Sequence, residues 1–274
     1  MAAVVNLVGA GKVGRVLGRL LAASGMVVQD VLTRSLASAQ DAVDFIGAGR
    51  AVGSMDQLRP ADIWLLAVSD DQIAPVCAQL AASYSLEGSV VFHCSGAKAS
   101  DELRAATGAL VASVHPVRSF ADPAHVAAHF KETFCGVEGD PRALAVLMPA
   151  MQAIGARVVP IDAAAKTVYH AASVFASNYL VTVMDAALRA YEAAGIAPDV
   201  ARALAAPLAT ETLANVLAMG PQAALTGPVA RGDMATVARQ QAALAAWEGE
   251  SGALYGALAD ATVRLAQRRD AQNS

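Results

Sequence analysis

The chain has 274 residues, of which 55% are hydrophobic and 16% are charged, and its formal net charge is −4. This composition is typical of a soluble globular protein with a large apolar core, and it excludes a disordered or fibrous chain. The slight negative charge gives no electrostatic reason to expect a nucleic-acid partner.

The chain opens with an apolar run and a glycine-rich turn. Residues 4–8 (VVNLV) predict a strand, and GAGKVG at 9–14 leads into a helix. A lone motif of this kind can be an ordinary turn, but between a strand and a helix it is typical of a dinucleotide-binding βαβ unit. The free N–H groups at the start of the helix favour a pyrophosphate. We therefore expect the cofactor to contact Gly9, Ala10, Gly11, Lys12, Val13 and Gly14.

The end of the second predicted strand, residues 26–32, bears on the choice of cofactor. An NAD site needs a carboxylate about 20 residues after the last glycine, but that count reaches Thr33. A guanidinium beside hydroxyl groups suits the 2′-phosphate of NADP. Asp30 is the counter-argument, although it lies inside the strand. We therefore predict NADP rather than NAD, bound by Thr33, Arg34 and Ser35.

Further apolar runs predict an open, doubly wound sheet of the Rossmann type. Strands are expected at 51–52, 62–68, 89–93 and 109–114, with weaker ones near 133–137 and 157–161, and helices at 72–83 and 141–154. Ligands of such sheets bind beyond the carboxyl ends of the strands. One crevice beside the glycine loop should therefore be lined by Val68, Ser69, Ser95, Gly96 and His115.

After about residue 161 the pattern becomes helical, with one long helix at 163–194, another from Pro198 and a last one at 243–268. We therefore expect a dinucleotide-binding domain over residues 1–161 and an all-helical substrate and dimerisation domain over residues 162–274. The uncharged stretch 171–184 is shorter than the roughly 20 residues of a membrane span, so we interpret it as a buried helix and expect no membrane partner. Helices rich in Ala and Leu with few charges predict a homodimer through this domain.

Polar residues recur on the first helix of that domain. Offsets of 4, 7 and 11 from Lys166 place His170, Ser173 and Ser177 on one stripe, with Asn178 at its edge. One interpretation is a solvated face. The other is a catalytic face, on which Lys166 transfers the proton while His170 and Asn178 orient a small-molecule substrate.

Several motifs resemble a known family: HCSGA at 93–97, HP at 115–116, KTVYHAA at 166–172, SN at 177–178 and LTGPVARGD at 225–233. The chain resembles a bacterial oxidoreductase family that joins a Rossmann-like domain to a C-terminal domain of unknown function. That family is similar to the 6-phosphogluconate dehydrogenase-like group, which includes ketopantoate reductase, pyrroline-5-carboxylate reductase and prephenate dehydrogenase. Several members carry Lys-x-x-x-Asn, of which this chain keeps Lys166 but has His170 in place of the asparagine.

The substrate is expected to meet residues on loops. Ser95 and Gly96 resemble the carboxylate-binding loop of β-hydroxyacid dehydrogenases. Ser95 and the backbone N–H groups there could hold a substrate carboxylate or the nicotinamide amide of the cofactor, although Ser95 could equally cap a helix. His115 resembles the His-Pro pair of prephenate dehydrogenases, and Arg231 could bind an anionic group. Asp233 is better interpreted as a helix cap. The remaining histidines have no partners at metal-ligand spacing, so no metal site is expected.

These features lead us to expect an NADP-dependent oxidoreductase that transfers hydride to a small carbonyl or imine compound, with an oxo acid similar to ketopantoate as the first candidate. The alternative is an NADP(H)-binding sensor or scaffold without turnover. Cys77, Cys94 and Cys135 are odd in number and outside any CxxC pattern, which favours free thiols in the reducing cytoplasm. No signal peptide is expected at the N-terminus.

Overall fold

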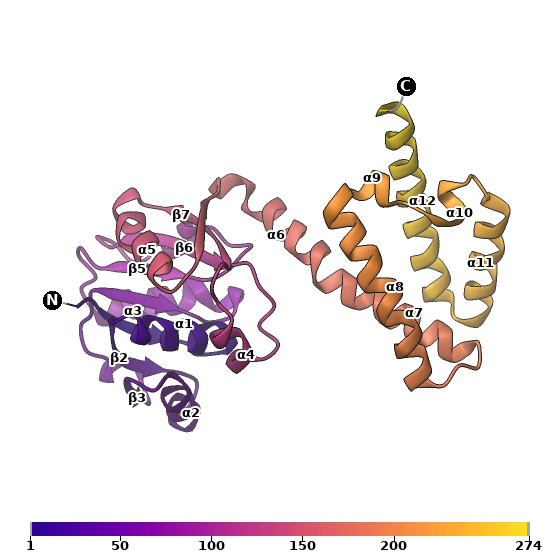
Figure 1. Cartoon of the computed structure of the whole chain (residues 1–274). Coiled ribbons are helices and arrows are strands. Elements are labelled where there is room, and N and C mark those ends of the chain that lie inside the picture. The colour runs from indigo at the N-terminus through magenta and orange to yellow at the C-terminus, as the bar shows by residue number, and fades with distance from the viewer. Residues whose placement is uncertain (1, 273–274) are drawn as a thin grey trace. The chain divides into compact units, whose positions relative to one another are not determined.

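The computed structural model describes residues 2–272. The chain forms two compact units, Met1–Ser177 and Asn178–Ser274 (Figure 1). The first unit contains an eight-stranded sheet, and the second is helical. The first unit also includes the helix that begins at Lys166, which the sequence analysis assigned to the helical domain.

The sheet of the first unit has the strand order β3-β2-β1-β4-β5-β6-β7-β8. Its neighbouring strands are parallel except β6 and β7, which are antiparallel. Polar residues at the carboxyl ends of the central parallel strands therefore meet at one edge, as the doubly wound prediction required. The strands are β1 Val4–Val8, β2 Val27–Leu32, β3 Arg50–Val52, β4 Ile63–Leu66, β5 Val90–His93, β6 Leu110–Pro116, β7 Phe134–Gly139 and β8 Arg157–Pro160.

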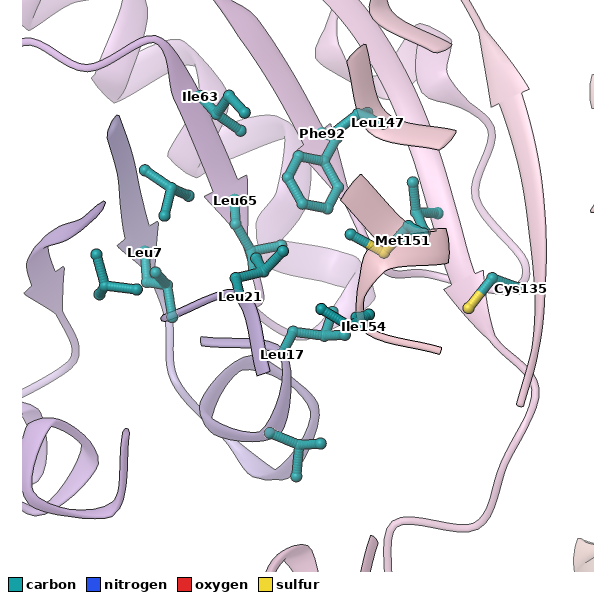
Figure 2. Close-up of a cluster of buried hydrophobic side chains, with 14 of the residues drawn as sticks. Leu7, Leu17, Leu21, Ile63, Leu65, Phe92, Cys135, Leu147, Met151 and Ile154 are labelled. Atoms are coloured by element: carbon teal, nitrogen blue, oxygen red, sulfur yellow. The ribbon is translucent and has the colours of Figure 1, made fainter. Parts of the chain in front are cut away.

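Two apolar cores lie on opposite faces of this sheet, because successive side chains of a strand point to opposite sides. In β4, Ile63 and Leu65 belong to one core, whereas Trp64 and Leu66 belong to the other. Figure 2 shows the first core, with Leu17 and Met151 of the covering helices packed beside the sheet. The helices of this unit are α1 Lys12–Ala23, α2 Leu36–Ile46, α3 Ile73–Ser83, α4 Pro123–Ala128, α5 Pro141–Ala153 and α6 Lys166–Ala176.

The second unit differs from the predicted helix boundaries in two places. The single helix predicted at 163–194 is interrupted at Ser177, whose φ of −127° and ψ of −71° are not helical. The predicted helix at 243–268 is also wrong, because Glu248 has extended backbone angles and separates two helices. The helices are α7 Asn178–Ala193, α8 Pro198–Met219, α9 Pro221–Ala224, α10 Gly227–Ala230, α11 Met234–Trp247 and α12 Gly249–Gln272.

The uncharged stretch at 171–184 is not the buried helix that the sequence predicted. Among the described residues, Ala163–Ala193 is long and apolar enough to cross a membrane by length and hydropathy, with a mean hydropathy of 1.3. None of this apolar window is buried within the single chain. Phe175 is 70% exposed and Val181 is 69% exposed, so the apolar side chains lie on the surface of the monomer.

Candidate functional site

The glycine loop between β1 and α1 packs tightly at two of its glycines and is open at the third. A Cβ atom on Gly9 would lie 2.6 Å from the carbonyl oxygen of Ala67, and the φ of Gly9 is +87°. A Cβ on Gly14 would lie 2.7 Å from the Ala67 side chain. At Gly11, by contrast, no atom lies within 4 Å of the added Cβ. The loop is thus held against the end of β4 while the backbone at Gly11 faces open space.

The start of α1 can accept an anion. Gly11 is the N-cap and provides no side-chain hydrogen bond to the first turn, which contains no acidic residue. The unpaired N–H groups and the positive end of the helix dipole favour a phosphate at this position. Lys12 begins the helix, and its ammonium donates to the carbonyl oxygen of Ala121, 2.9 Å away. Val13 packs against the adjacent apolar core.

A cavity of about 750 Å³ lies at the carboxyl ends of β1, β2 and β4. This volume is within the range of cofactor sites. Of the predicted cofactor residues, Lys12, Val13, Gly14, Ser35 and Ser95 are not in its lining, and Ser35 instead caps α2 by accepting from the N–H of Ser38. The predicted residues that do line the cavity are Gly9, Ala10, Gly11, Thr33, Arg34, Val68 and Ser69.

Arg34 and Asp30 have opposite situations at this cavity. Arg34 is exposed and lines the cavity, and it has no ion-pair partner among the side chains of residues 2–268. Asp30 is fully buried and forms ion pairs with Arg50 at 2.9 Å and Arg59 at 2.7 Å. Burial alone would raise the pKa of Asp30, but hydrogen bonds from Arg59 and Arg50 lower it below its ordinary value. Asp30 is therefore already engaged by protein groups, whereas the Arg34 guanidinium is available to a ligand.

A second group of residues lies at the carboxyl ends of β5 and β6, also within the first unit. The imidazoles of His115 and His170 are stacked, with ring centroids 5.5 Å apart and planes inclined by 17°. Gly96 makes this arrangement possible, because a Cβ there would lie 2.7 Å from His115 and 2.8 Å from His170. Nδ1 of His115 is 2.9 Å from the phenol oxygen of Tyr169. The predicted residues Gly96, His115 and His170 are thus brought together.

His115 is neutral at neutral pH. Burial lowers its pKa to about 4, and the nearby His170 and Lys166 act in the same direction. Its neighbour Tyr169 is protonated, because burial raises the pKa of the phenol above its ordinary value. The cluster therefore presents hydrogen-bonding groups without a fixed charge on His115.

Ser95 caps a turn and not the helix N-terminus that the sequence suggested as an alternative, because the next helical element begins only at Ser100. Its hydroxyl oxygen accepts from the N–H groups of Ala97 at 3.2 Å and Lys98 at 2.9 Å. The Ser95 side chain is nearly buried. These bonds fix the turn that carries Gly96, so Ser95 shapes the loop beside the two histidines.

Lys166 is buried and paired rather than free in the crevice. Its ammonium lies 3.0 Å from Oε1 of Glu138 and also donates to the hydroxyl of Ser113. The Glu138 carboxylate accepts from the N–H and the hydroxyl of Ser100, at 2.9 and 2.7 Å. Burial lowers the pKa of Lys166, while Glu138 acts against that change. The sheet register aligns this network, since His93 faces Ser113 and Ser113 faces Glu138 across three strands.

The remaining predicted residues do not join this group. Ser177 ends α6 with non-helical angles, so it does not continue the stripe of Lys166 and His170. Asn178 and Arg231 belong to the second compact unit, where both are exposed, and their roles stay predictions. Asp233 caps α11 by accepting from the N–H of Thr236 at 3.1 Å, as interpreted from the sequence.

Three residues of the site, Glu138, Ser113 and Tyr169, were not predicted from the sequence. Glu138 is a single acid in the otherwise apolar strand β7, which is an unusual position for a charge and could have suggested a buried partner. Tyr169 lies inside the KTVYHAA motif but was not singled out. Among the described residues, no group of three or more His, Cys, Asp or Glu side chains could hold a metal ion.

Two family models match this chain. A Rossmann-like domain matches residues 2–116, and a domain of unknown function (DUF2520) matches residues 133–262. The chain therefore joins a Rossmann-like domain to a DUF2520 domain. This confirms the resemblance inferred from the motifs. The DUF2520 match begins at the start of β7, so it includes Glu138 as well as Lys166, Tyr169 and His170.

Solved structures support the same fold assignment. Protein TM1727 from Thermotoga maritima is 27% identical, with a TM-score of 0.73, over 97% of this chain and 99% of that chain. BF3122 from Bacteroides fragilis, described as a proposed NADP oxidoreductase, is 20% identical, with a TM-score of 0.81, over 96% and 98%. A pyrroline-5-carboxylate reductase from Coxiella burnetii is 18% identical, with a TM-score of 0.59, over 98% and 99%. A comparison with curated proteins finds no match.

Proposed function

We propose that this Rossmann–DUF2520 chain is an NADP-dependent oxidoreductase that acts on a small carbonyl or imine compound, with an oxo acid similar to ketopantoate as the first candidate. The observation that carries the proposal is the pairing of an open glycine loop with an unpaired arginine across one cavity. Gly11 leaves space at the start of α1, and Arg34 lines the same cavity. A pyrophosphate and a 2′-phosphate would suit these two positions.

The residues around Arg34 favour NADP over NAD. Recognition of NAD needs a carboxylate that accepts from the ribose 2′-hydroxyl. Asp30 is the acid in β2, and both of its oxygens already accept from Arg50 and Arg59. The guanidinium of Arg34 and the N-terminus of α2 after the Ser35 cap supply positive potential instead. Among the solved structures, a pyrroline carboxylate reductase from Plasmodium falciparum is described with NADP bound and a prephenate dehydrogenase from A. aeolicus with NAD+, so the preference for NADP is argued from Arg34 and Asp30 alone.

The chemistry would take place near the ends of β5 and β6. When bound, the nicotinamide ring supplies or accepts the hydride. The chain must hold the acceptor atom about 3–3.5 Å from that ring, exclude water and provide a hydrogen-bond donor for the oxygen or nitrogen that gains charge. Gly96, His115 and His170 form a group of suitable chemistry at this edge.

The buried ion pair changes the role that we propose for Lys166. Its ammonium would have to leave Glu138 in order to donate to a substrate. Because a carboxylate left unpaired in this buried position is costly, we propose that Lys166 positions α6 while the imidazoles contact the substrate. Asn178 and Arg231 remain proposed substrate contacts on the evidence of sequence alone.

A second candidate, an NADP(H)-binding sensor without turnover, is favoured by the same ion pair, since the residue predicted to transfer the proton is engaged by Glu138. Calorimetric titration with NADPH and NADH tests whether either cofactor binds. Assays of NADPH oxidation with 2-oxo acids and cyclic imines then test turnover. Binding together with turnover of one compound supports the enzyme, and binding without turnover across the panel supports the sensor. Absence of binding by both cofactors contradicts both candidates.

We also propose that the chain forms a homodimer through its helical region and works in the cytoplasm. The dimer is supported by the exposed apolar side chains along α6, α7 and α8, several of which are more than half exposed. Large exposed apolar patches commonly mark an interface. The cytoplasmic location is supported by the three free cysteines, Cys77, Cys94 and Cys135.

A further inference from the structure

Tyr169 and His115 form a hydrogen bond, and which of the two side chains donates has a consequence for the imidazole. Their contact joins the phenol oxygen to Nδ1 of the imidazole over 2.9 Å, and the two rings meet edge to face. A neutral imidazole carries one proton, so one ring nitrogen donates and the other accepts. The direction of the hydrogen bond between Nδ1 and Tyr169 therefore decides whether Nε2, the ring nitrogen beside Gly96, carries the proton.

The surroundings of Tyr169 favour the phenol as the donor. The phenol oxygen lies against the backbone of Gly136, where a Cβ would be 2.4 Å from it. Burial raises the pKa of the phenol above its ordinary value, so Tyr169 keeps its proton at neutral pH. Among the side chains of residues 2–268, His115 is the one that forms a hydrogen bond with the phenol. A phenol O–H is a stronger donor than a neutral imidazole N–H, and an imidazole nitrogen is a stronger acceptor than a phenol oxygen, so the proton of Tyr169 points to Nδ1 of His115.

We infer that Tyr169 fixes His115 as the Nε2–H tautomer, so that a neutral imidazole donates a hydrogen bond to the oxygen of a carbonyl substrate. Nε2 has no hydrogen-bond partner among the described residues, and it lies beside the Cα of Gly96. Gly96 leaves space beside that nitrogen, since a Cβ at this position would lie 2.7 Å from it. Tyr169 is then a positioning residue, which acts through His115.

This inference rests on the proposed function and narrows its substrate class. A carbonyl oxygen has lone pairs that accept from Nε2–H, and it gains negative charge during reduction. A protonated imine carries no lone pair on nitrogen, so it gains nothing from this donor. The geometry therefore favours a carbonyl compound over a protonated cyclic imine. The hydrogen bond from neutral Nε2–H to the carbonyl oxygen is modest before the reaction. It strengthens as that oxygen gains negative charge, so it stabilises the transition state more than the bound substrate.

The tautomer can be measured without a substrate. In ¹⁵N-labelled full-length protein, long-range ¹H–¹⁵N correlation distinguishes the protonated ring nitrogen from the bare one at neutral pH. We expect His115 to carry its proton on Nε2, and Tyr169→Phe to produce a mixture of the two tautomers. Tyr255→Phe is the matched control, because it removes a phenol hydrogen bond to Gln240 in the second unit and should leave His115 unchanged. A proton on Nδ1 in the unaltered protein overturns the inference, whether or not the chain binds NADPH.

Variants of His115 test the role of the donor. The amide nitrogen of glutamine can occupy the position of Nε2, whereas that of asparagine lies nearer the position of Nδ1. We expect His115→Gln to keep carbonyl reduction within about tenfold of the unaltered protein and His115→Asn to lose about tenfold more, which corresponds to one hydrogen bond of about 1.4 kcal/mol. Equal losses in both variants, or reduction of protonated imines but not of carbonyls, overturn the assignment. Unchanged NADPH affinity in both variants shows that the cofactor site of the proposed function is intact.

Discussion

The ammonium of Lys166 and the carboxylate of Glu138 are joined at 3.0 Å, with the two side chains only 1% and 5% exposed. This ion pair connects the first residue of α6 to β7, and Glu138 also holds Ser100 at the end of the loop after β5. His170 lies one turn after Lys166 on α6, so the pair also sets where His170 meets His115. Because both charges are buried, removing one of them should lower the free energy of unfolding by a measurable amount.

We predict that Lys166→Met lowers the free energy of unfolding by about 3–5 kcal/mol, because it leaves the Glu138 carboxylate buried without its partner. Lys166→Met combined with Glu138→Gln should recover much of this loss, since both charges are then absent. Urea denaturation followed by circular dichroism measures the difference. The exposed ion pair Lys98–Glu102 serves as the control, and Lys98→Met should leave the free energy of unfolding nearly unchanged. A Lys166→Met protein of unchanged stability contradicts the positioning role.

We predict that the free energy of unfolding falls as the pH is lowered from about 6.5 to about 4. Burial lowers the pKa of both His93 and His115 to about 4, from an ordinary value of 6.5. In this interval the unfolded chain binds protons that the folded chain does not, so the folded state loses stability as pH falls. The loss is at most about 3 kcal/mol for each histidine. Above pH 7 neither histidine makes the free energy of unfolding depend on pH.

The pH prediction is checked by thermal unfolding at a series of pH values. His93→Gln should flatten the decrease between pH 6.5 and 4, after correction for its lower starting stability, because it removes one of the two groups. His125 is exposed, so His125→Gln is the matched control and should leave the slope unchanged. If the unaltered protein, His93→Gln and His125→Gln lose stability equally between pH 6.5 and 4, the buried histidines are not the cause of the loss.

Most of the first unit could be predicted from its sequence, because local pattern and tertiary structure agree there. The apolar runs that predicted β1, β4 and β5 are buried on both faces of the sheet, and the glycine loop lies where its spacing required. The partner of Lys166 could not be predicted, since Glu138 reaches it only through the antiparallel pairing of β6 and β7. Sequence spacing along α6 correctly related Lys166 to His170 but gave no indication of what each side chain would meet.

The exposed apolar surface was also beyond sequence reasoning. An uncharged helical run such as 171–184 looks the same whether its side chains are covered by the same chain, by another copy or by lipid. In the structure, neither compact unit buries its own part of this stretch. The helix break at Ser177 was missed because no glycine or proline signals it, whereas the break at Glu248 was missed although Gly249 follows it directly.

We predict that the protein is a dimer at micromolar concentration and that the apolar surface of α7 is part of the interface. Val181 is 69% exposed on α7, and Val181→Asp should reduce the mass in light scattering to that of a monomer, because a carboxylate would be buried in the interface. Val146→Asp on α5 is the control, since Val146 is 41% exposed in the other unit. A monomeric mass for the unaltered protein contradicts this prediction. If that monomer floats together with lipid vesicles in a density gradient, the apolar surface of α7 binds a membrane instead.

The last prediction concerns Arg34 and the choice of cofactor. We expect NADPH to bind at least about tenfold more tightly than NADH, because a charge-assisted contact to phosphate contributes about 1.5–3 kcal/mol. Arg34→Ala should remove most of this preference and leave the affinity for NADH nearly unchanged, since no other part of the cofactor needs the guanidinium. Arg19→Ala is the control, because Arg19 is an exposed arginine of α1 that donates to Phe45 and is absent from the cavity lining. Calorimetric titration of the three proteins with both cofactors gives the affinities. Equal affinities for NADPH and NADH in the unaltered protein would show that Arg34 does not select the phosphate, and Asp30 could not take over that choice without first leaving Arg50 and Arg59.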